Sequence, residues 1–211
     1  MKFRTVFLAM LLACAGALPQ AWAQSAAPAA NATAIPAFKP AEKLKSGYIP
    51  NLGQMAPNLY RGGQPEAEGY AELQKLGVGI VVNFRETEKA DKNERAAVEK
   101  LGMKYVDIPW SGFDDPDNKH VAQFLQVLRE NPDTKVFFHC RRGAERTGVM
   151  GAAYRMTFQG WTPEQALQEM EQFKFRGFWF RHLKRYVRSF PDQLKTDPAL
   201  KPFAPPAVAA N

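Results

Sequence analysis

Residues 136–148 read Val-Phe-Phe-His-Cys-Arg-Arg-Gly-Ala-Glu-Arg-Thr-Gly, and this stretch decides the expected fold. Its apolar start predicts a short buried strand that delivers Cys140 to the edge of a sheet. Gly143 permits a tight turn, and a helix predicted from about Arg146 aims its free N–H groups back at the cysteine. The pattern therefore predicts a loop that holds an anion against the sulfur atom.

The side chains of this loop indicate attack of the cysteine on phosphorus. A free thiol has a pKa of about 8.5, but a helix N-terminus and a fixed guanidinium favour ionisation, so we expect Cys140 to be a thiolate at neutral pH. Arg146 can hold two phosphoryl oxygens with its planar fork, a geometry that lysine does not offer. The Thr147 hydroxyl is expected to donate to the sulfur and ease departure of the thiolate from a phosphocysteine. His139 is expected to orient the loop rather than to shuttle protons.

The stretch resembles the His-Cys-x-x-Gly-x-x-Arg-Thr-Gly signature of the cysteine-dependent tyrosine and dual-specificity phosphatases. Residues 59–65, 81–85 and 160–166 are similar to segments of the small exported bacterial members, so the resemblance covers about residues 48–190. The family implies a single α/β domain, no metal or other cofactor, and phosphomonoester hydrolysis through a phosphocysteine. It also implies an aspartic acid on a separate loop.

The resemblance implies that the rest of the loop surrounds the bound phosphate. The residues expected to contact the substrate are Arg141, Arg142, Gly143, Ala144, Glu145 and Gly148. Glu145 departs from the family pattern, which often has a small or polar residue there. Because a carboxylate in the pocket would repel phosphate, we expect its side chain to point outward.

A leaving oxygen must be protonated as the P–O bond breaks, so we expect a carboxylic acid near the loop but outside it. Residues 107–117 hold four aspartates between a predicted strand and a predicted helix, where the family places its acid-bearing loop. Asp117 is the predicted N-cap of the helix, and Asp107 belongs to the strand. Asp114 and Asp115 remain, and resemblance to the bacterial relatives favours Asp114 as the general acid. Without the cysteine loop, a solvated turn would be the preferred interpretation.

Hydrophobic periodicity predicts strands that alternate with helices, hence a mixed, mostly parallel sheet flanked by helices and followed by a helical C-terminal half. The predicted strands cover residues 48–55, 58–61, 78–84, 103–108 and 136–138. The predicted helices cover residues 66–76, 94–101, 118–130, 147–158, 163–173 and 179–190.

The first 23 residues predict a secretory signal peptide. They combine a basic start, an apolar run at residues 6–18 that is short for a bilayer span, and a small-residue cleavage site ending at Ala23. Lipoprotein processing at Cys14 is the alternative. We therefore expect an exported protein, periplasmic or secreted, with no transmembrane segment.

Composition predicts the domain limits. Ala/Pro-rich stretches suggest a flexible linker at residues 24–45 and a flexible tail at 193–211, which leaves 46–192 for the phosphatase domain. After cleavage Cys140 is the only cysteine, so no internal disulfide can form.

The net charge of +7 favours anionic partners, here a phosphorylated protein or small molecule. We expect no nucleic-acid partner and a monomeric chain.

Two features near the C-terminus are interpreted as structural. The aromatic run at residues 178–180 is expected in the core. Arg181, Lys184, Arg185 and Arg188 recur at helical spacing, which is typical of a solvated helix face.

Three functions are compatible with these features. The favoured one is an exported phosphatase acting on phosphotyrosine in proteins, with phosphoserine and phosphothreonine as further substrates. The second is the same chemistry on small polyanions such as inositol phosphates or phosphoinositides; family members that take these often carry lysines in the loop, unlike this chain. The third, a non-catalytic phosphate-binding module, is disfavoured by the presence of Cys140, Arg146 and an aspartate loop together.

Overall fold

Six strands form one sheet in the order β1-β2-β3-β6-β4-β5. The structure is a computed structural model that describes residues 38–86 and 93–205. These residues belong to one compact unit. The signal peptide and most of the linker predicted from the sequence lie outside the described residues.

The central strands are parallel. The bounds are β1 (Glu42–Lys43), β2 (Gly53–Ala56), β3 (Leu59–Gly63), β4 (Val78–Asn83), β5 (Lys104–Asp107) and β6 (Lys135–Cys140). Strand β6 pairs in parallel with β3 on one side and with β4 on the other, β5 continues the parallel part, and β1 and β2 add an antiparallel edge. The predicted mixed, mostly parallel sheet is confirmed. Its central strand ends at Cys140, and carboxyl ends of parallel strands are where ligands bind in such folds.

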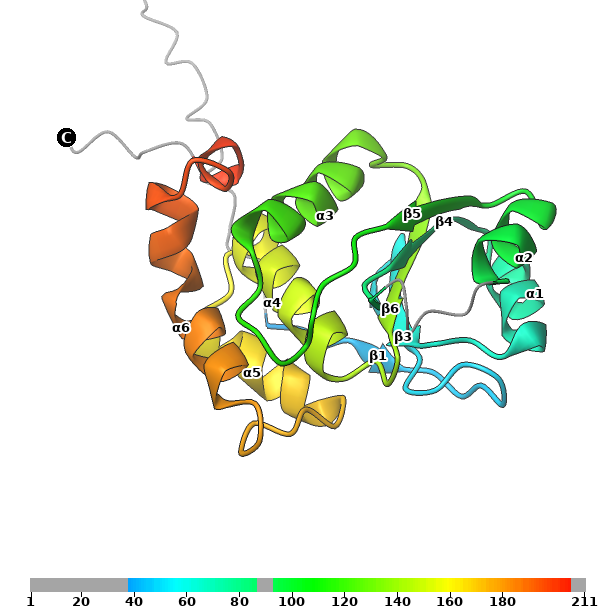
Figure 1. The fold of residues 1–211 in the computed structure, drawn as a ribbon, viewed down its shortest axis with the longest axis horizontal. Coiled ribbons are helices and arrows are strands. Elements are labelled where there is room, and N and C mark those ends of the chain that lie inside the picture. Colours follow the sequence, from blue (N-terminus) through cyan, green and yellow to red (C-terminus); the bar gives the residue numbers. More distant parts are fainter. Residues whose placement is uncertain (1–37, 87–92, 206–211) are drawn as a thin grey trace, which may run out of the picture. The chain divides into compact units, whose positions relative to one another are not determined.

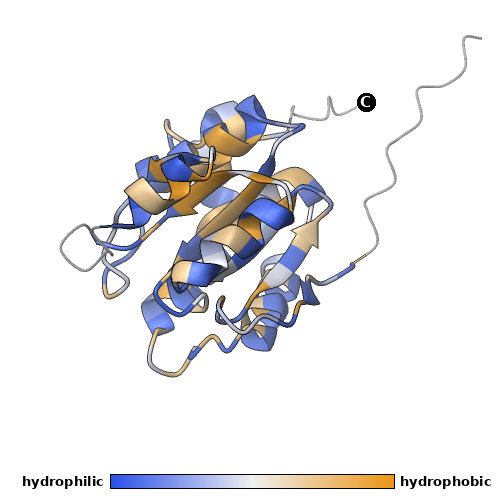
Figure 2. Cartoon of the chain, turned by 90° about the vertical axis from the view of Figure 1, so that its right-hand side faces the viewer, coloured by the Kyte–Doolittle hydropathy of each residue, from blue (hydrophilic) through white to orange (hydrophobic). Residues whose placement is uncertain are grey.

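Helices cover both faces of the sheet. They are α1 (Ala67–Lys75), α2 (Glu94–Lys100), α3 (Asn118–Glu130), α4 (Glu145–Gln159), α5 (Pro163–Gln172) and α6 (Arg181–Thr196), followed by the short 3-10 helix η1 (Lys201–Phe203). Figure 1 shows α1 and α2 on one face and the other four α-helices on the opposite face. Figure 2 shows the hydrophobic strands lying between helices that carry many hydrophilic residues.

Alternation along β6 supplies both cores. Phe138 faces the larger core, where its ring lies 4.9 Å from that of Phe124 on α3 and 6.0 Å from that of Phe84. Phe137 faces the smaller core with Leu73 of α1. Successive side chains of a strand point to opposite faces, and each fully buried Phe contributes about 1.5–3 kcal/mol. The apolar run before the cysteine therefore anchors β6 in the cores on both faces of the sheet.

Two predicted helix starts are confirmed by their caps. The Asp117 carboxylate accepts a 2.8 Å hydrogen bond from the Lys119 amide at the start of α3. Thr162 and Gln165 form a reciprocal capping box at the start of α5, with Pro163 in the first helical position.

Helices and strands extend beyond the predicted domain limits at residues 46 and 192. Strand β1 belongs to the sheet, and the buried Ala41 amide donates a 2.7 Å hydrogen bond to Glu169 on α5. At the other end, α6 continues to Thr196, and Leu200 is fully buried. Composition hides these contacts because Ala41 and its partner lie 128 positions apart in the sequence.

The strand predicted at residues 48–55 is also shorter than expected. Only Gly53–Ala56 forms β2, and Asn51 in the preceding turn adopts a left-handed φ of 56°. Asparagine tolerates this conformation better than most residues. The turn brings the Asn51 side chain to the cysteine loop.

Candidate active site

The cysteine loop joins the end of β6 to the start of α4 and turns at Gly143. Gly143 has a φ of 69°, and a Cβ there would lie 2.4 Å from the backbone carbon of Gly62 on β3. Any side chain would force β3 and the loop apart, since real Cβ atoms do not approach backbone this closely. The glycine predicted to allow the turn is therefore required for the contact of the loop with β3 as well.

Two side chains outside the loop fix its position. The Asn51 amide donates to the Gly143 carbonyl at 3.0 Å and to the Phe173 carbonyl, just after α5, at 2.8 Å. The fully buried Arg61 guanidinium donates to the same Gly143 carbonyl at 3.0 Å and lies 4.1 Å from the centre of the Phe173 ring. Burial lowers the pKa of Arg61 to about 10, so its charge remains at neutral pH.

The Cys140 thiol is buried, with only 2% of the residue exposed, yet its surroundings favour the thiolate. Burial raises the pKa of Cys140, but hydrogen bonds from the Thr147 hydroxyl and amide, the Arg146 charge and a hydrogen bond from the Arg142 amide together bring it below its ordinary value. This direction agrees with the predicted thiolate. Thr147 itself is fully buried, and its hydroxyl lies near the sulfur and also 3.4 Å from the Gly62 carbonyl.

Backbone carbonyls hold the Arg146 guanidinium at the pocket. Its Nη1 donates to the Phe84 carbonyl at 3.1 Å and to the Trp110 carbonyl at 2.9 Å. These bonds fix the planar group while leaving other N–H donors for a ligand. The Trp110 side chain is buried in the larger core, so this residue acts on the site through its carbonyl.

A cavity of about 600 Å³ opens over Cys140 and is rich in arginine. Its walls come from the cysteine loop, the segment after β4, the predicted acid loop and the turn between α5 and α6. The lining residues are Arg85, Glu86, Gly112, Phe113, Cys140, Arg141, Arg142, Glu145, Arg146, Arg176 and Phe180. Five of the eleven are cationic, so the cavity suits an anion.

The expectation that Glu145 points outward is wrong. The residue is 7% exposed and lines the cavity. Its carboxylate lies 3.0 Å from Arg176 Nε and 3.7 Å from Arg142 Nη1. These two guanidinium groups neutralise the carboxylate, so its repulsion of an anion bound in the cavity is reduced.

A second carboxylate in the cavity was missed by sequence reasoning. Glu86 Oε2 lies 3.8 Å from Arg146 Nη1, and the side chain is about one-third exposed (30%). The sequence offered one indication of its role: Glu86 directly follows residues 81–85, which resemble a segment of the bacterial phosphatases.

The predicted acid loop reaches the cavity only in part. Gly112 and Phe113 line the cavity, whereas Asp114 and Asp115 are both exposed and do not. Asp115 lies near enough to Tyr186 on α6 to raise the pKa of that phenol, an effect secondary to burial. Asp114, adjacent to Phe113, is therefore the closer of the two to the cavity along the chain.

His139 faces away from the cavity into a buried polar cluster. Its Nε2 lies 3.0 Å from Glu94 Oε1 at the start of α2, and both side chains are fully buried. Glu94 also accepts hydrogen bonds from Gln64 at 2.8 Å and Tyr105 at 3.1 Å. Burial raises the pKa of Glu94, but His139 and these donors bring it below its ordinary value. Gln64 in turn accepts a 2.6 Å bond from Arg85, which connects the cluster to the cavity wall.

The other loop residues that were expected to contact the substrate differ in their exposure. Arg141 and Arg142 are exposed at the cavity, whereas Ala144 and Gly148 are buried at the start of α4, joined by a 2.9 Å backbone hydrogen bond. Gly148 allows close packing, since a Cβ there would lie 3.0 Å from Met170 on α5.

The aromatic run at residues 178–180 is not a core element, contrary to expectation. Phe178 and Trp179 are 69% and 74% exposed, and only Phe180 is buried. Of the predicted basic face, Arg188 pairs with Glu164 and Lys184 with Glu171.

Comparison with known proteins agrees with this geometry. Residues 30–186 match the family described as "PTP-NADK: DSP-PTPase phosphatase fused to NAD+ Kinase". The chain belongs to this family of DSP/PTP-type phosphatases. It is 37% identical over 128 residues to the dual specificity protein phosphatase TpbA of Pseudomonas aeruginosa strain UCBPP-PA14, an alignment covering 59% of this chain and 55% of TpbA. The chain therefore spans about half the length of the curated relatives it matches.

Solved structures of this phosphatase family share the fold. The crystal structure of P. aeruginosa TpbA superposes with a TM-score of 0.60 at 31% identity, covering 71% of this chain and 89% of that one. A structure of TpbA in complex with pTyr also gives 0.60, at 29% identity, with 71% and 88% covered. The α/β fold and the cysteine-dependent phosphatase resemblance are thereby confirmed. In residues 38–86 and 93–205, none of the helices is both long and apolar enough to cross a bilayer.

Proposed function

We propose that this chain is an exported phosphatase that hydrolyses phosphotyrosine in proteins, with phosphoserine and phosphothreonine as further substrates. The observation that carries the proposal is the Cys140 thiol, held at a cationic cavity with its pKa lowered by Thr147 and Arg146. Membership of the phosphatase family and the similarity to TpbA support the same conclusion. Export rests on the N-terminal sequence alone.

The proposed reaction has two steps. The Arg146 fork binds phosphoryl oxygens, and the Cys140 thiolate attacks phosphorus as the bond to the leaving oxygen breaks and that oxygen takes a proton from the general acid. Water then attacks the phosphocysteine, inorganic phosphate leaves, and the Thr147 hydroxyl stabilises the returning thiolate. The product alcohol or phenol carries the acid's proton, and the attacking water restores it.

We propose Asp114 as the general acid, with Asp115 as the alternative. Asp114 directly follows Phe113, which lines the cavity, whereas Asp115 is one residue further from it. Since the Asp114 side chain is exposed, the acid loop must turn it toward the leaving oxygen when substrate binds. Glu86, which already lines the cavity, is a third carboxylate in reach and is tested with the other two.

A second substrate class has support from the cavity wall. Arg85, Arg141, Arg142, Arg146 and Arg176 together offer more positive charge than one phosphate monoester requires. Such a wall favours small polyanions, including inositol phosphates and phosphoinositides. Ion pairing of Arg142 and Arg176 with Glu145 reduces that excess charge, which is why a protein substrate is preferred here.

The experiment is metal-free hydrolysis, in chelator and reducing agent, of a phosphotyrosine peptide, a phosphoserine peptide and an inositol polyphosphate. Cys140→Ser serves as the control, because a hydroxyl is a weaker nucleophile while the anion site stays nearly intact. We expect turnover of the phosphotyrosine peptide that disappears in Cys140→Ser. Faster turnover of the inositol polyphosphate would support the second class. Phosphate binding without any turnover would instead indicate a non-catalytic module.

A further inference from the structure

The most exposed aromatic side chains of the described residues gather at the mouth of the cavity. Phe113, Phe178 and Trp179 are 77%, 69% and 74% exposed, whereas the other exposed large hydrophobic residues are all below half. Phe113 lines the cavity, and its ring lies 6.1 Å from that of Phe180, which continues directly from Trp179. Two segments far apart in the sequence thus place bare rings around one opening.

Burying such rings in water-free surroundings is favourable, and leaving them exposed is costly. Each fully buried aromatic side chain removes about 150–250 Å² from water, and exposed apolar groups that gather on one surface mark an interaction site. Phe178 and Trp179 do not line the catalytic cavity. Their exposure therefore calls for a partner other than the phosphoryl group that the cavity binds.

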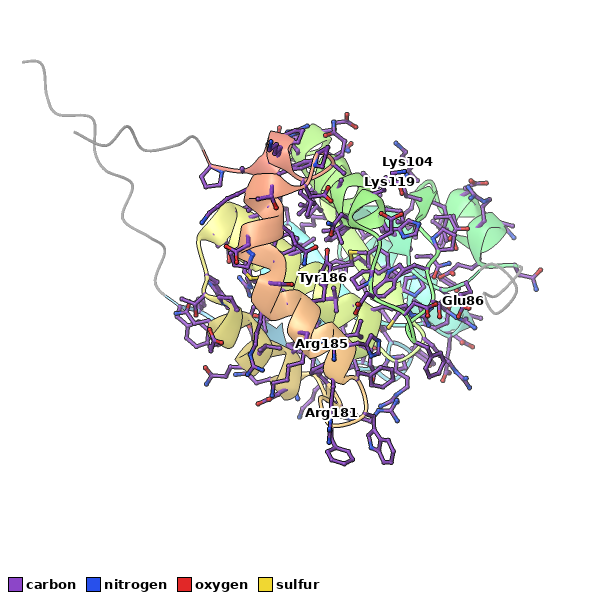
Figure 3. The ribbon with its side chains drawn as sticks, turned by 60° about the vertical axis from the view of Figure 1, so that its left-hand side comes forward. Glu86, Lys104, Lys119, Arg181, Arg185 and Tyr186 are labelled. Atoms are coloured by element: carbon purple, nitrogen blue, oxygen red, sulfur yellow. The ribbon has the colours of Figure 1, made fainter. Side chains whose placement is uncertain are left out.

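Unpaired cations occur in the same turn as these rings and on the helix that follows it. Lys174, Arg181 and Arg185 are exposed and have no carboxylate at ion-pair distance within the described residues. Arg176, Lys184 and Arg188, in the same part of the chain, are each paired with a glutamate. The Arg181 guanidinium lies 4.8 Å from the centre of the Phe178 ring. Figure 3 shows Arg181 and Arg185 one turn apart on α6, the spacing at which side chains share a helix face.

We propose that this aromatic rim, consisting of Phe113, Phe178 and Trp179 with the cations Lys174, Arg181 and Arg185, docks on an anionic lipid bilayer. Trp rings favour the boundary between headgroups and acyl chains, and Lys and Arg beside them are attracted to negative headgroups. Docking would hold the cavity mouth against the membrane surface. The proposal concerns where the enzyme works and goes beyond the choice of phosphoester that it hydrolyses.

Trp179 is a built-in reporter of this contact. Of the other three tryptophans, Trp110 and Trp161 are both 5% exposed, so they should respond little to lipid, and Trp22 is present in the wild type and in Trp179→Phe alike. The full chain is mixed with phosphatidylglycerol vesicles or with phosphatidylcholine vesicles, and the emission of Trp179→Phe is subtracted from that of the wild type. We expect the Trp179 emission to move to shorter wavelength with phosphatidylglycerol and to stay unchanged with phosphatidylcholine.

Vesicle co-sedimentation of variants tests the residues. Arg181→Gln and Arg185→Gln should each weaken binding to phosphatidylglycerol by about fivefold at low ionic strength, and salt should weaken the wild type. Phe178→Ser with Trp179→Ser should weaken it by at least about tenfold. Phe158→Ser is the matched control, since Phe158 on α4 is 42% exposed and lines a different cavity. The wild type and all variants carry the same apolar N-terminal run, so any vesicle binding by that run is common to all of them.

Hydrolysis of p-nitrophenyl phosphate by the rim variants should remain as in the wild type, which checks that the cavity is intact. An unshifted Trp179 emission with phosphatidylglycerol would overturn the proposal, as would equal vesicle binding by the Phe178 and Trp179 double variant. If that double variant instead loses kcat/KM for a phosphotyrosine peptide without vesicles, the rim docks peptide and the lipid assignment is wrong.

Discussion

Removing the Asn51 side chain should loosen the cysteine loop at a predictable cost. The amide makes two short hydrogen bonds to backbone carbonyls, to Gly143 at 3.0 Å and to Phe173 at 2.8 Å, and a weak third one to Arg142 at 3.4 Å. A neutral hydrogen bond contributes about 1 kcal/mol net, and a new glycine destabilises by about another 0.5–1 kcal/mol through the unfolded chain. Asn51→Gly, which accepts the left-handed φ of 56°, should therefore lower the free energy of unfolding by about 2–3 kcal/mol.

The same substitution should slow catalysis, because the Gly143 carbonyl would keep only its bond from Arg61. A small displacement of catalytic groups can cost up to about a hundredfold in rate, so we expect kcat/KM to fall by about tenfold to a hundredfold. Asn58→Gly is the control, since the Asn58 side chain donates a hydrogen bond to the Pro132 carbonyl at 2.6 Å, away from the loop. Urea unfolding and steady-state kinetics are measured for both. An Asn51→Gly chain with unchanged stability and unchanged kcat/KM would refute the reasoning.

Three further predictions follow from the site. Asp114→Asn should cut kcat for a phosphotyrosine peptide by on the order of 10² to 10⁴ but much less for p-nitrophenyl phosphate, whose oxygen leaves without a proton. If Asp115→Asn or Glu86→Gln shows that pattern and Asp114→Asn does not, the acid is the residue that shows it. Thr147→Val removes a donor to the sulfur, so the acid limb of the pH–kcat/KM profile should move to higher pH; an unmoved limb contradicts the role of the hydroxyl. Because the folded-state pKa of Glu94 lies below its ordinary value of 4.5, its stabilisation is present above that value and is lost as pH falls through the lower pKa. The stability of Glu94→Gln should accordingly be lower than that of the wild type at neutral pH and should change less on acidification, as urea unfolding at several pH values would reveal.

The parts of the site predicted from sequence are those that local structure creates. An apolar strand, a glycine and a helix start occur within one short stretch, so Cys140, Arg146 and Thr147 could be placed together before any coordinates. The general acid, by contrast, is decided by where an exposed loop turns its side chains. Neither Asp114 nor Asp115 carries a sequence signal that fixes this direction.

The supports of the loop come from distant positions and were not predictable. Asn51 lies 92 positions from Gly143, and Arg61 lies 82 positions from it. Their roles depend on the sheet order, which brings the segments before and within β3 beside the end of β6. The Glu94 partner of His139 is hidden for the same reason.

The aromatic run at residues 178–180 shows a second limit of prediction from sequence, which concerns burial. Hydrophobicity alone predicts burial, but this turn buries Phe180 and leaves Phe178 and Trp179 in water. The three residues lie in the turn between α5 and α6, and the periodicity of a helix does not predict which side chains a turn buries.

The most direct test of the account is capture of the phosphoryl group on Cys140. The wild-type chain is mixed with a phosphotyrosine peptide, quenched within the first turnover, digested and analysed by mass spectrometry. The account predicts one phosphoryl group on the peptide containing Cys140, formed by the wild type and absent from Cys140→Ser. Phosphate release by the wild type with no modified cysteine, under a quench shown to preserve phosphocysteine, would contradict the central claim.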